Sequence, residues 1–198
     1  MNDVFEAHPD IDFVHLNYGV QRGIDFTKPE QIDFSIFDHE LVSNYTSPVR
    51  LIAALLPYLK DRKAGLAFTT SQLALVTLTS RPGYGGSKAA LHSFIITLRA
   101  QLAKNAAYKQ LKIVELYPPA VQTEMHDSKN QPDLKNGHMI GMPLPDFTDE
   151  LWTQLEKGNE NIAIGSAKEF YDKIEPARVE ADRGWNAAMD DALKDFLA

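Results

Sequence analysis

Strand-like and helix-like segments alternate along the first part of this chain. Short apolar runs predict buried strands at Ile11–Val20, Ala64–Ser71 and Leu111–Tyr117. Between them, Asp38–Arg62 and Ser87–Ala106 carry apolar residues at the spacing of one helix face. Strands that alternate with helices are typical of a parallel sheet with helices packed on it. The pattern therefore predicts an α/β fold.

The remaining segments complete this pattern. Gln122–Pro145 is polar and holds two glycines and three prolines, so we expect a long loop with at most a short helix. After it we expect a helix at Phe147–Lys157, a short strand or turn at Asn161–Gly165, and a helix at Ala167–Leu197 that is broken near Pro176 and Gly184. A length of 198 residues suits a single domain, residues 1–198.

Charge and composition argue against several kinds of ligand. The chain has 20 Lys and Arg against 27 Asp and Glu, so its formal charge of −7 gives no general attraction to nucleic acid or anionic lipid. It has no cysteine and hence no thiolate metal ligand. His15, His39 and His92 have no second ligand at zinc spacing, so we expect ordinary packing or surface residues and no metal site. A small-molecule ligand is expected.

The sequence also bears on location. No apolar run approaches the ~20 residues that a membrane-spanning helix needs. Met1–Asp10 carries acidic residues where a secretory signal would be basic and then apolar. We therefore expect a cytoplasmic protein that does not enter a membrane.

Tyr84 and Lys88 stand four residues apart at the start of the second long helix. On a helix this spacing puts both side chains on one face, about 5–6 Å apart at Cβ. An ammonium group at that distance favours the phenolate, so we expect the pKa of Tyr84 to fall from about 10 toward neutrality. The two residues then form a general acid–base pair.

Two polar residues precede this pair. Ser71 lies at the carboxyl end of a predicted strand, where side chains of an open α/β sheet reach the ligand crevice. Asn44 lies 27 residues before it, in the preceding helix. Together with Tyr84 and Lys88, they resemble the site of the short-chain dehydrogenase/reductase family, which consists of Asn, Ser and Tyr-x-x-x-Lys at about these separations.

The resemblance runs from about Ile11 to Ala198 and includes two further motifs. Leu16-Asn17-Tyr18-Gly19 stands where the family has Asn-Asn-Ala-Gly, and Pro118-Pro119-Ala120-Val121-Gln122-Thr123 stands where the family has Pro-Gly-x-Val-x-Thr. The resemblance implies a truncated Rossmann-like parallel sheet of about four strands with flanking helices. It also implies an NAD(P)-dependent oxidoreductase that acts on a carbonyl/alcohol pair.

The resemblance implies a role for each site residue. Tyr84 would exchange a proton with the substrate oxygen, and Lys88 would lower the pKa of Tyr84 and bind the nicotinamide ribose. Ser71 would hydrogen-bond the substrate oxygen, and Asn44 would hold a water that links Lys88 to solvent. The implied cofactor-binding residues are Asn17, Gly19, Tyr84, Lys88, Val121 and Thr123. Residues 122–146 match the family's substrate-binding loop, in which the implied substrate contacts are Met125, His126 and Met139.

The chain departs from the family pattern at its N-terminal side. None of its 11 glycines forms the Gly-rich turn, after a strand, that cradles a pyrophosphate at a helix N-terminus. Its first strand matches the family's fourth, so the adenine and pyrophosphate half of the cofactor site is not encoded here. Pro119 replaces a glycine, and Tyr18 replaces a small alanine beside the cofactor. These departures argue against tight binding of NAD(P) by this chain alone.

Three functions remain open. The first is the oxidoreductase that the resemblance implies. A second is a cofactor-free isomerase, dehydratase or cyclase that uses Tyr84, Lys88 and Ser71 for proton transfer without hydride. The third is a non-catalytic remnant that folds with a partner. In each case the strand Ile11–Val20 would form a sheet edge with both faces uncovered, so we expect a homo-oligomer or a partner that covers this edge.

Overall fold

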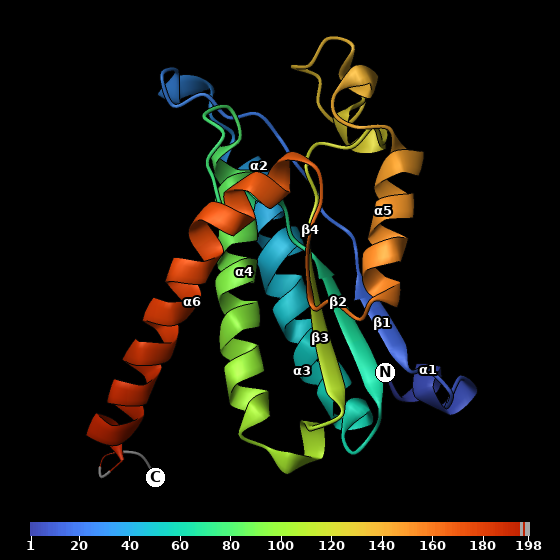
Figure 1. Ribbon diagram of the computed structural model, residues 1–198. Coiled ribbons are helices and arrows are strands. Elements are labelled where there is room, and N and C mark those ends of the chain that lie inside the picture. Colours follow the sequence, from blue (N-terminus) through green and yellow to red (C-terminus); the bar gives the residue numbers. More distant parts are fainter. Residues whose placement is uncertain (195, 197–198) are drawn as a thin grey trace.

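Four parallel strands form the centre of this computed structural model, which describes residues 1–194 and 196. In chain order, the strands are β1 (Phe13–Leu16), β2 (Ala64–Thr69), β3 (Leu111–Tyr117) and β4 (Asn161–Ala163). Each strand is hydrogen-bonded in parallel to the next one along the chain, so their order in the sheet is also their order in the sequence (Figure 1). The predicted Rossmann-like α/β fold with about four strands is confirmed.

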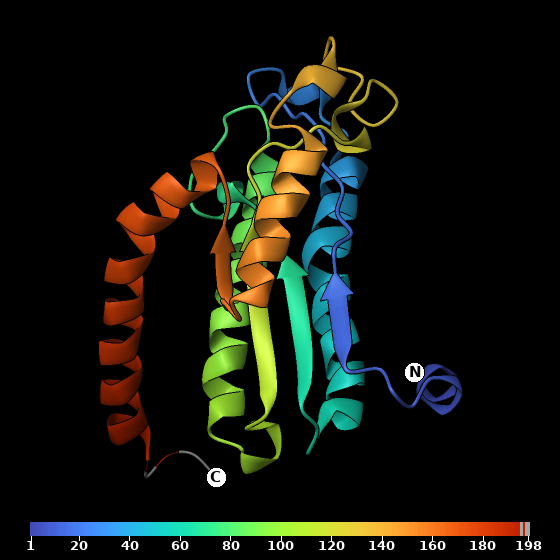
Figure 2. The ribbon, with the colours of Figure 1, turned by 45° about the vertical axis from the view of Figure 1, so that its right-hand side comes forward.

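Helices cover the two faces of this sheet. Figure 2 shows one face packed against α3 (Ser47–Leu59) and α4 (Pro82–Ala103), and the opposite face packed against α5 (Leu144–Glu156). The remaining helices are α1 (Asn2–Ala7) before β1, α2 (Phe34–Leu41) before α3, and α6 (Ser166–Leu193), which runs beside α4. Across residues 1–194 and 196, we find no helix with the length and apolar character of a membrane span.

Alternation along the central strands divides the core into two clusters. Leu66 and Phe68 of β2 join Ile113 of β3 in a cluster with apolar side chains of α3 and α4. Ala67 and Val114 point the other way and pack with apolar side chains of α5. Successive strand residues face opposite sides of a sheet, and β2 and β3 carry apolar residues on both sides because both of their faces are covered.

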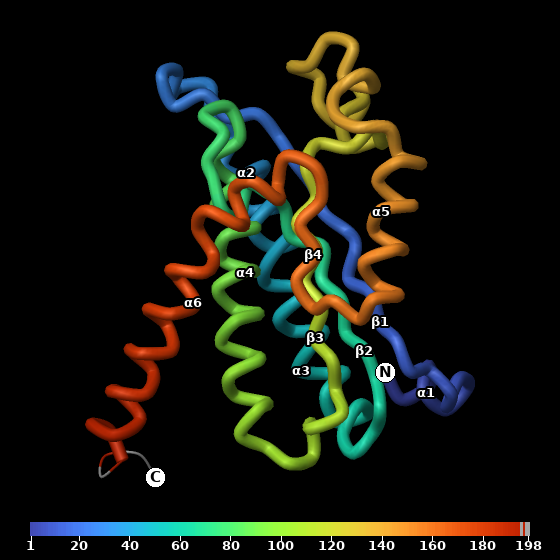
Figure 3. The backbone as a smooth tube through the Cα atoms, viewed as in Figure 1, coloured from blue at the N-terminus to red at the C-terminus, as the bar shows by residue number. Residues whose placement is uncertain are grey.

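The long loops all leave the same end of the sheet, at the top of Figure 3. Because the strands are parallel, their carboxyl ends lie together at this edge. The loop 17–33 follows β1, residues 70–81 follow β2, and residues 118–143 follow β3. Segments far apart in the sequence therefore meet above the sheet, where ligands of open α/β proteins bind.

Two elements that position the site differ in extent from those predicted. The ladder of β1 covers Phe13–Leu16, not the whole of Ile11–Val20, because the chain after Leu16 is held by a side chain of the π-helical turn before α3 and not by β2. In addition, α4 starts at Pro82, five residues before Ser87. Proline suits the first helical position, since that residue needs no intrahelical N–H bond. The earlier start brings Tyr84 into the first turn of α4.

The predicted breaks in the C-terminal helix do not occur. Pro176 and Gly184 both lie inside α6, which bends but continues (Figure 2). A proline inside a helix removes one backbone hydrogen bond and causes a kink, and neighbouring turns can carry the helix on. The predicted end of this helix, Leu197, lies outside the described residues.

One face of the edge strand β1 is open. Val14 and Leu16 pack into the cluster under α3, whereas Phe13 is 48% exposed and His15 is exposed on the opposite face. The prediction that both faces of this strand are uncovered is therefore wrong for the α3 side. It holds for the other side, because the apolar side chains of α5 pack on β2, β3 and β4 and not on β1.

Candidate active site

A cavity of about 420 Å³ lies at the carboxyl edge of the sheet. Its walls come from the ends of β1, β2 and β3, from the start of α4, from the segment 118–140 and from α5. Ser71 and Tyr84 both line it, so the sheet and α4 bring together two hydroxyl groups that the sequence separates by 13 residues. Ser71 follows β2 and caps a short 3₁₀-helix, with its Oγ accepting a hydrogen bond from the N–H of Leu73 at 3.0 Å.

Lys88 lies one turn after Tyr84 on the same face of α4. Its Nζ is 5.7 Å from the centroid of the Tyr84 ring and donates a hydrogen bond of 2.7 Å to the carbonyl oxygen of Thr69. Lys88 is only 2% exposed, and it is not among the described residues that line the cavity. The structure thus brings Tyr84, Lys88 and Ser71 together, with the ammonium group over the phenol ring.

Burial, not the neighbouring ammonium, dominates the protonation of Tyr84. Burial raises its pKa to about 12, the charge of Glu40 adds to this rise, and a hydrogen bond with Ser71 opposes it. Burial also lowers the pKa of Lys88 to about 8, although the charge of Glu115 acts in the opposite direction. The expected fall in the pKa of Tyr84 is therefore absent from this structure. Both shifts favour the neutral forms, as expected for buried groups.

Asn44 occupies a fully buried position in the π-helical turn Val42–Thr46. Its Oδ1 accepts a bond from the N–H of Val20 at 2.9 Å, and its Nδ2 donates to the carbonyl of Val20 at 2.8 Å and to Ser87 Oγ at 3.0 Å. Ser87 lies between Tyr84 and Lys88 on α4. Asn44 therefore ties the chain after β1 to the helix that carries the acid–base pair.

The predicted cofactor residues lie along one side of the cavity. Asn17, Val121 and Thr123 line it, and Asn17 Oδ1 accepts a hydrogen bond of 2.8 Å from Thr69 Oγ1. Gly19 packs where a Cβ would lie 3.2 Å from Asn44 Oδ1 and 3.3 Å from the Nζ of the buried lysine. A side chain at this glycine would fill the space between these groups.

The predicted substrate residues separate into two groups. Met125 and His126 line the cavity, but Met139 is 68% exposed and is not among the described lining residues. The expected substrate contact by Met139 therefore has no basis in the structure, because the short 3₁₀-helix Gly137–Met139 turns this side chain outward. Its neighbour Ile140 lines the cavity instead.

The sequence analysis missed a polar cluster that joins the loop after β3 to the start of α4. Gln131 is fully buried, and its Nε2 donates to Gln21 Oε1 at 2.8 Å and to the carbonyl of Met125 at 2.8 Å. Its Oε1 accepts a bond of 3.0 Å from Nε of Arg81, whose Nη2 forms an ion pair of 2.8 Å with Asp133. No spacing signal marks these residues, since Gln21 and Gln131 are 110 positions apart.

A buried carboxylate also supports the start of α4. Glu40 is fully buried, and its Oε1 accepts a hydrogen bond of 2.6 Å from the N–H of Arg22. Its Oε2 has no hydrogen-bond partner within the described residues and lies against Gly83, next to Tyr84. A Cβ at Gly83 would stand 2.2 Å from that oxygen. The carboxylate therefore fits only because this position of the helix is glycine.

The same substitution at two glycines of α4 should have opposite effects. We expect Gly83→Ala to lower the free energy of unfolding by about 1–3 kcal/mol, because the new methyl group displaces a buried carboxylate. Gly86→Ala should raise it by about 0.5–1 kcal/mol, because alanine is the better helix former and no atom lies within 4 Å of the new Cβ. Denaturant unfolding of both variants measures this difference. Equal shifts would contradict the role assigned to Gly83.

Fold and site together define an α/β protein of the Rossmann-like class, with a tyrosine–lysine pair beside a cavity at the carboxyl edge of its parallel sheet. Residues 1–134 match the family model described as short chain dehydrogenase. The chain belongs to the short-chain dehydrogenase family.

Curated relatives agree with this assignment. The chain is 30% identical over 158 residues to the uncharacterized oxidoreductase DltE of Bacillus subtilis (strain 168), an alignment that covers 79% of this chain and 60% of DltE. It is 33% identical over 117 residues to a fatty acyl-CoA reductase of Acinetobacter baylyi, which covers 58% of this chain and 38% of that enzyme. The chain thus spans 60% or less of the length of these relatives.

Solved structures share the fold. A short chain dehydrogenase from Burkholderia cenocepacia J2315 in complex with NADP matches with a TM-score of 0.68 and 25% identity, over 94% of this chain and 74% of that one. A short chain dehydrogenase/reductase from Burkholderia phymatum in complex with NAD has a TM-score of 0.69 at 17% identity, over 82% of this chain and 64% of that one. The second likeness shows the fold alone.

Proposed function

We propose that this protein is an oxidoreductase that interconverts a carbonyl compound and an alcohol. The observation that carries the proposal is the convergence of the Tyr84 and Ser71 side chains on one cavity, with the ammonium of Lys88 5.7 Å from the Tyr84 ring. Membership of the short-chain dehydrogenase family supports the same reaction class.

In the proposed reaction, two hydroxyl groups act on the substrate oxygen. Ser71 and Tyr84 donate hydrogen bonds to it, and these bonds strengthen as negative charge develops on that oxygen during reduction. Tyr84 then transfers its proton to the oxygen. The resulting phenolate is stabilised by Lys88, which is held in place by the carbonyl of Thr69. In alcohol oxidation, the same proton moves in the opposite direction.

The residues present fit the nicotinamide half of NAD(P). Asn17, Val121 and Thr123 line the cavity, and Gly19 leaves open the space beside Asn44 that a Cβ would fill. We propose that these residues, with Tyr84 and Lys88, hold that half of the cofactor. When bound, NAD(P)H would supply the hydride for carbonyl reduction, and NAD(P)⁺ would accept it in alcohol oxidation. The 198 residues contain no Gly-rich turn for the pyrophosphate, so the proposed contacts are confined to the nicotinamide side.

The cavity favours a substrate with an apolar body. Most of its wall away from the two hydroxyl groups is aliphatic or aromatic, with Leu73, Leu78, Leu134, Ile140, Phe147 and Leu151 among the lining residues. Binding an apolar group there removes apolar surface from water, which contributes roughly 25 cal/mol per Å². We therefore propose an aldehyde or ketone with an aliphatic or aromatic body, placed between α5 and the loop 122–146 with Met125 and His126 beside it.

A cofactor and turnover assay tests this function. NADH or NADPH at about 100 times its Kd adds ~2.7 kcal/mol to the free energy of unfolding, which raises Tm by about 5–10 °C for a chain of this size. We expect such a shift with one of the two cofactors, and its oxidation when apolar aldehydes or ketones are added. Loss of the carbonyl compound without nicotinamide would point instead to a cofactor-free isomerase, dehydratase or cyclase. If the cofactors cause no shift in Tm and no turnover is detected, catalysis by this chain is contradicted.

The open face of β1 bears on partners. Phe13, 48% exposed, and the exposed His15 lie on the uncovered side of an edge strand, and such edges tend to pair with further chains or segments. We propose that a second copy or another polypeptide segment covers this edge when the protein is active.

A further inference from the structure

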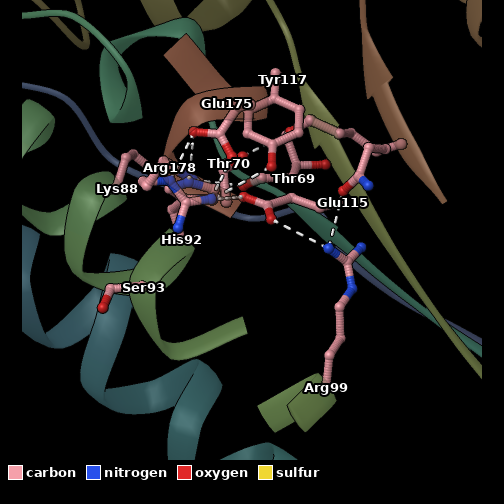
Figure 4. A network of polar contacts seen from close by, with 12 residues as sticks. Thr69, Thr70, Lys88, His92, Ser93, Arg99, Glu115, Tyr117, Glu175 and Arg178 are labelled. Carbon is pink, nitrogen blue, oxygen red and sulfur yellow. Dashed lines mark hydrogen bonds and ion pairs between the residues drawn. The ribbon is translucent and has the colours of Figure 1, made fainter. Parts of the chain in front are cut away.

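A buried ionic cluster lies on the α4 face of the sheet, one turn beyond Lys88. His92 of α4 is 5% exposed, Glu115 of β3 is fully buried, and Glu175 of α6 is 2% exposed. In Figure 4 the imidazole stands between the two carboxylates. Its Nδ1 is 2.9 Å from Glu115 Oε1 and its Nε2 is 3.3 Å from Glu175 Oε1. His92 is therefore a buried residue, as the packing alternative of the prediction had it, but its two carboxylate partners were not predicted.

This geometry selects the charged form of His92. A neutral imidazole donates from one ring nitrogen only, whereas here each ring nitrogen faces a carboxylate oxygen. Only the imidazolium donates to both. Burial alone would lower the pKa of His92, but the hydrogen bonds and charges of Glu115 and Glu175 outweigh it and raise the pKa to about 9.

Other polar groups surround the same imidazole. From β3, the hydroxyl of Tyr117 lies 3.3 Å from Nδ1, and burial raises the pKa of Tyr117, so it stays neutral. From α6, Arg178 bonds to both oxygens of Glu175, and Tyr171 packs edge-on against Tyr117 with ring centroids 5.2 Å apart. Burial raises the pKa of Tyr171 as well. His92, with a pKa of about 9, is therefore the group of the cluster expected to change its charge in the mildly alkaline range.

Glu115 depends on His92 for its charge compensation. Its Oε1 is paired with His92, while its Oε2 has no hydrogen-bond partner among residues 1–194. Arg99, further along α4, approaches that oxygen only to 4.0 Å. Loss of the imidazolium would leave a buried carboxylate with weak compensation, close enough to Lys88 for its charge to act on that ammonium group.

The cluster is also the main inward attachment of α6. Within Ser166–Leu193, the buried residues are Ala167, in the first turn, and Glu175. Two further polar ties between α6 and the rest of the chain, Ser166 with Gln72 and Lys104 with Asp190, join exposed side chains. Beyond its first turn, α6 is therefore held to the rest of the chain mainly by the bond between Glu175 and His92 and by the packing of Tyr171 against Tyr117.

We propose that His92 is a positioning residue: as an imidazolium it clamps β3 and α6 onto the catalytic helix α4 and sets the electrostatic environment of Lys88. The effect of this clamp on turnover rests on the proposed function, but the clamp itself does not. Deprotonation of the imidazole should loosen α6 and change the charge felt by Lys88.

NMR titration of the full chain tests the clamp directly. Side-chain ¹⁵N spectra from about pH 5.5 to about pH 10 report the protonation of the six histidines, and the signal missing in His92→Gln identifies His92. We expect this signal to titrate near pH 9, as its surroundings require. Glu175→Gln should lower that midpoint by at least about one unit. The control is Glu169→Gln, which removes an exposed carboxylate paired with Lys173 on the same helix.

Two further readouts separate positioning from simple packing. In His92→Gln, the ¹³Cε signal of Lys88 should titrate about one unit higher than in the parent, because the charge of Glu115 is no longer compensated. Hydrogen exchange in α6 should quicken by at least about tenfold in His92→Gln and Glu175→Gln, but not in Glu169→Gln. If His92 had a purely structural role, its replacement would change hydrogen exchange in α6 and leave the titration of Lys88 unchanged.

Defined outcomes overturn the proposal. A His92 midpoint at or below the ordinary value of about 6.5, or an unchanged midpoint in Glu175→Gln, rules out the clamp. An unchanged Lys88 titration in His92→Gln rules out the coupling. If His92→Gln does not fold, the milder Glu175→Gln is used for the His92 titration, the Lys88 titration and hydrogen exchange in α6. Absence of turnover alongside the expected titrations would refute the proposed function and leave the clamp standing.

Discussion

Replacing Tyr84 with phenylalanine is expected to lower kcat/KM for the carbonyl substrate by a factor of about 10²–10⁴. The change removes one oxygen and leaves the buried ring in place beside Lys88. The substrate oxygen then loses its proton donor and one of its two hydrogen bonds, both of which matter most in the transition state. Steady-state kinetics with saturating cofactor measure the effect.

Tyr108→Phe is the matched control for this variant. Tyr108 is partly exposed in the 3₁₀ turn Ala106–Tyr108 before β3, at the opposite end of the sheet, and is not among the described residues that line the cavity. The same loss of one hydroxyl there should change kcat/KM by less than about threefold, as expected for a surface substitution. If Tyr84→Phe retained activity within the same margin, Tyr84 could not be the proton donor. Another polar residue of the cavity would then have to supply the proton.

Phe68→Ala is expected to lower the free energy of unfolding by about 3–5 kcal/mol. Phe68 is fully buried in β2, in the cluster that holds α3 and α4 against the sheet. Truncation to alanine removes the apolar contacts of the ring and leaves a cavity that the surrounding helices fill only in part. A loss of this size is a large fraction of the total stability of a typical domain. Urea unfolding followed by circular dichroism gives the difference.

The control is the same substitution at Phe13. This side chain is 48% exposed on the open face of β1, so Phe13→Ala should cost less than about 1.5 kcal/mol. A similar cost at both positions would mean that the two phenylalanines are equally buried in solution. That result would place a covering chain or segment on the open face of β1 and would revise the exposure described above.

Much of the fold could be predicted from local patterns. β2 and β3 carry apolar residues on both faces, and the helices between the strands repeat their apolar residues at helical spacing, so a parallel α/β sheet follows from the order of these segments. Tyr84 and Lys88 could be paired because four residues on a helix amount to about one turn. Ser71 could be placed at the same edge because it follows a strand of that sheet.

The protonation of the site could not be predicted in the same way. Spacing alone suggested that Lys88 would lower the pKa of Tyr84, but burial of the phenol outweighs its neighbour and raises the pKa to about 12. Burial is a property of the whole packed structure. The sequence shows which charges are near along a helix, and it does not show how much water each group retains.

The sequence by itself determined the elements of this protein, their order, and the residues Tyr84, Lys88 and Ser71, because these depend on short-range periodicity and on the ends of strands. Only the tertiary structure decided which distant polar groups meet. Gln21 lies against Gln131, and His92 against Glu175, because loops and helices separated by 83 to 110 residues pack onto one sheet. Such contacts carry no local pattern, since they are selected by the requirement that each buried polar group find a partner.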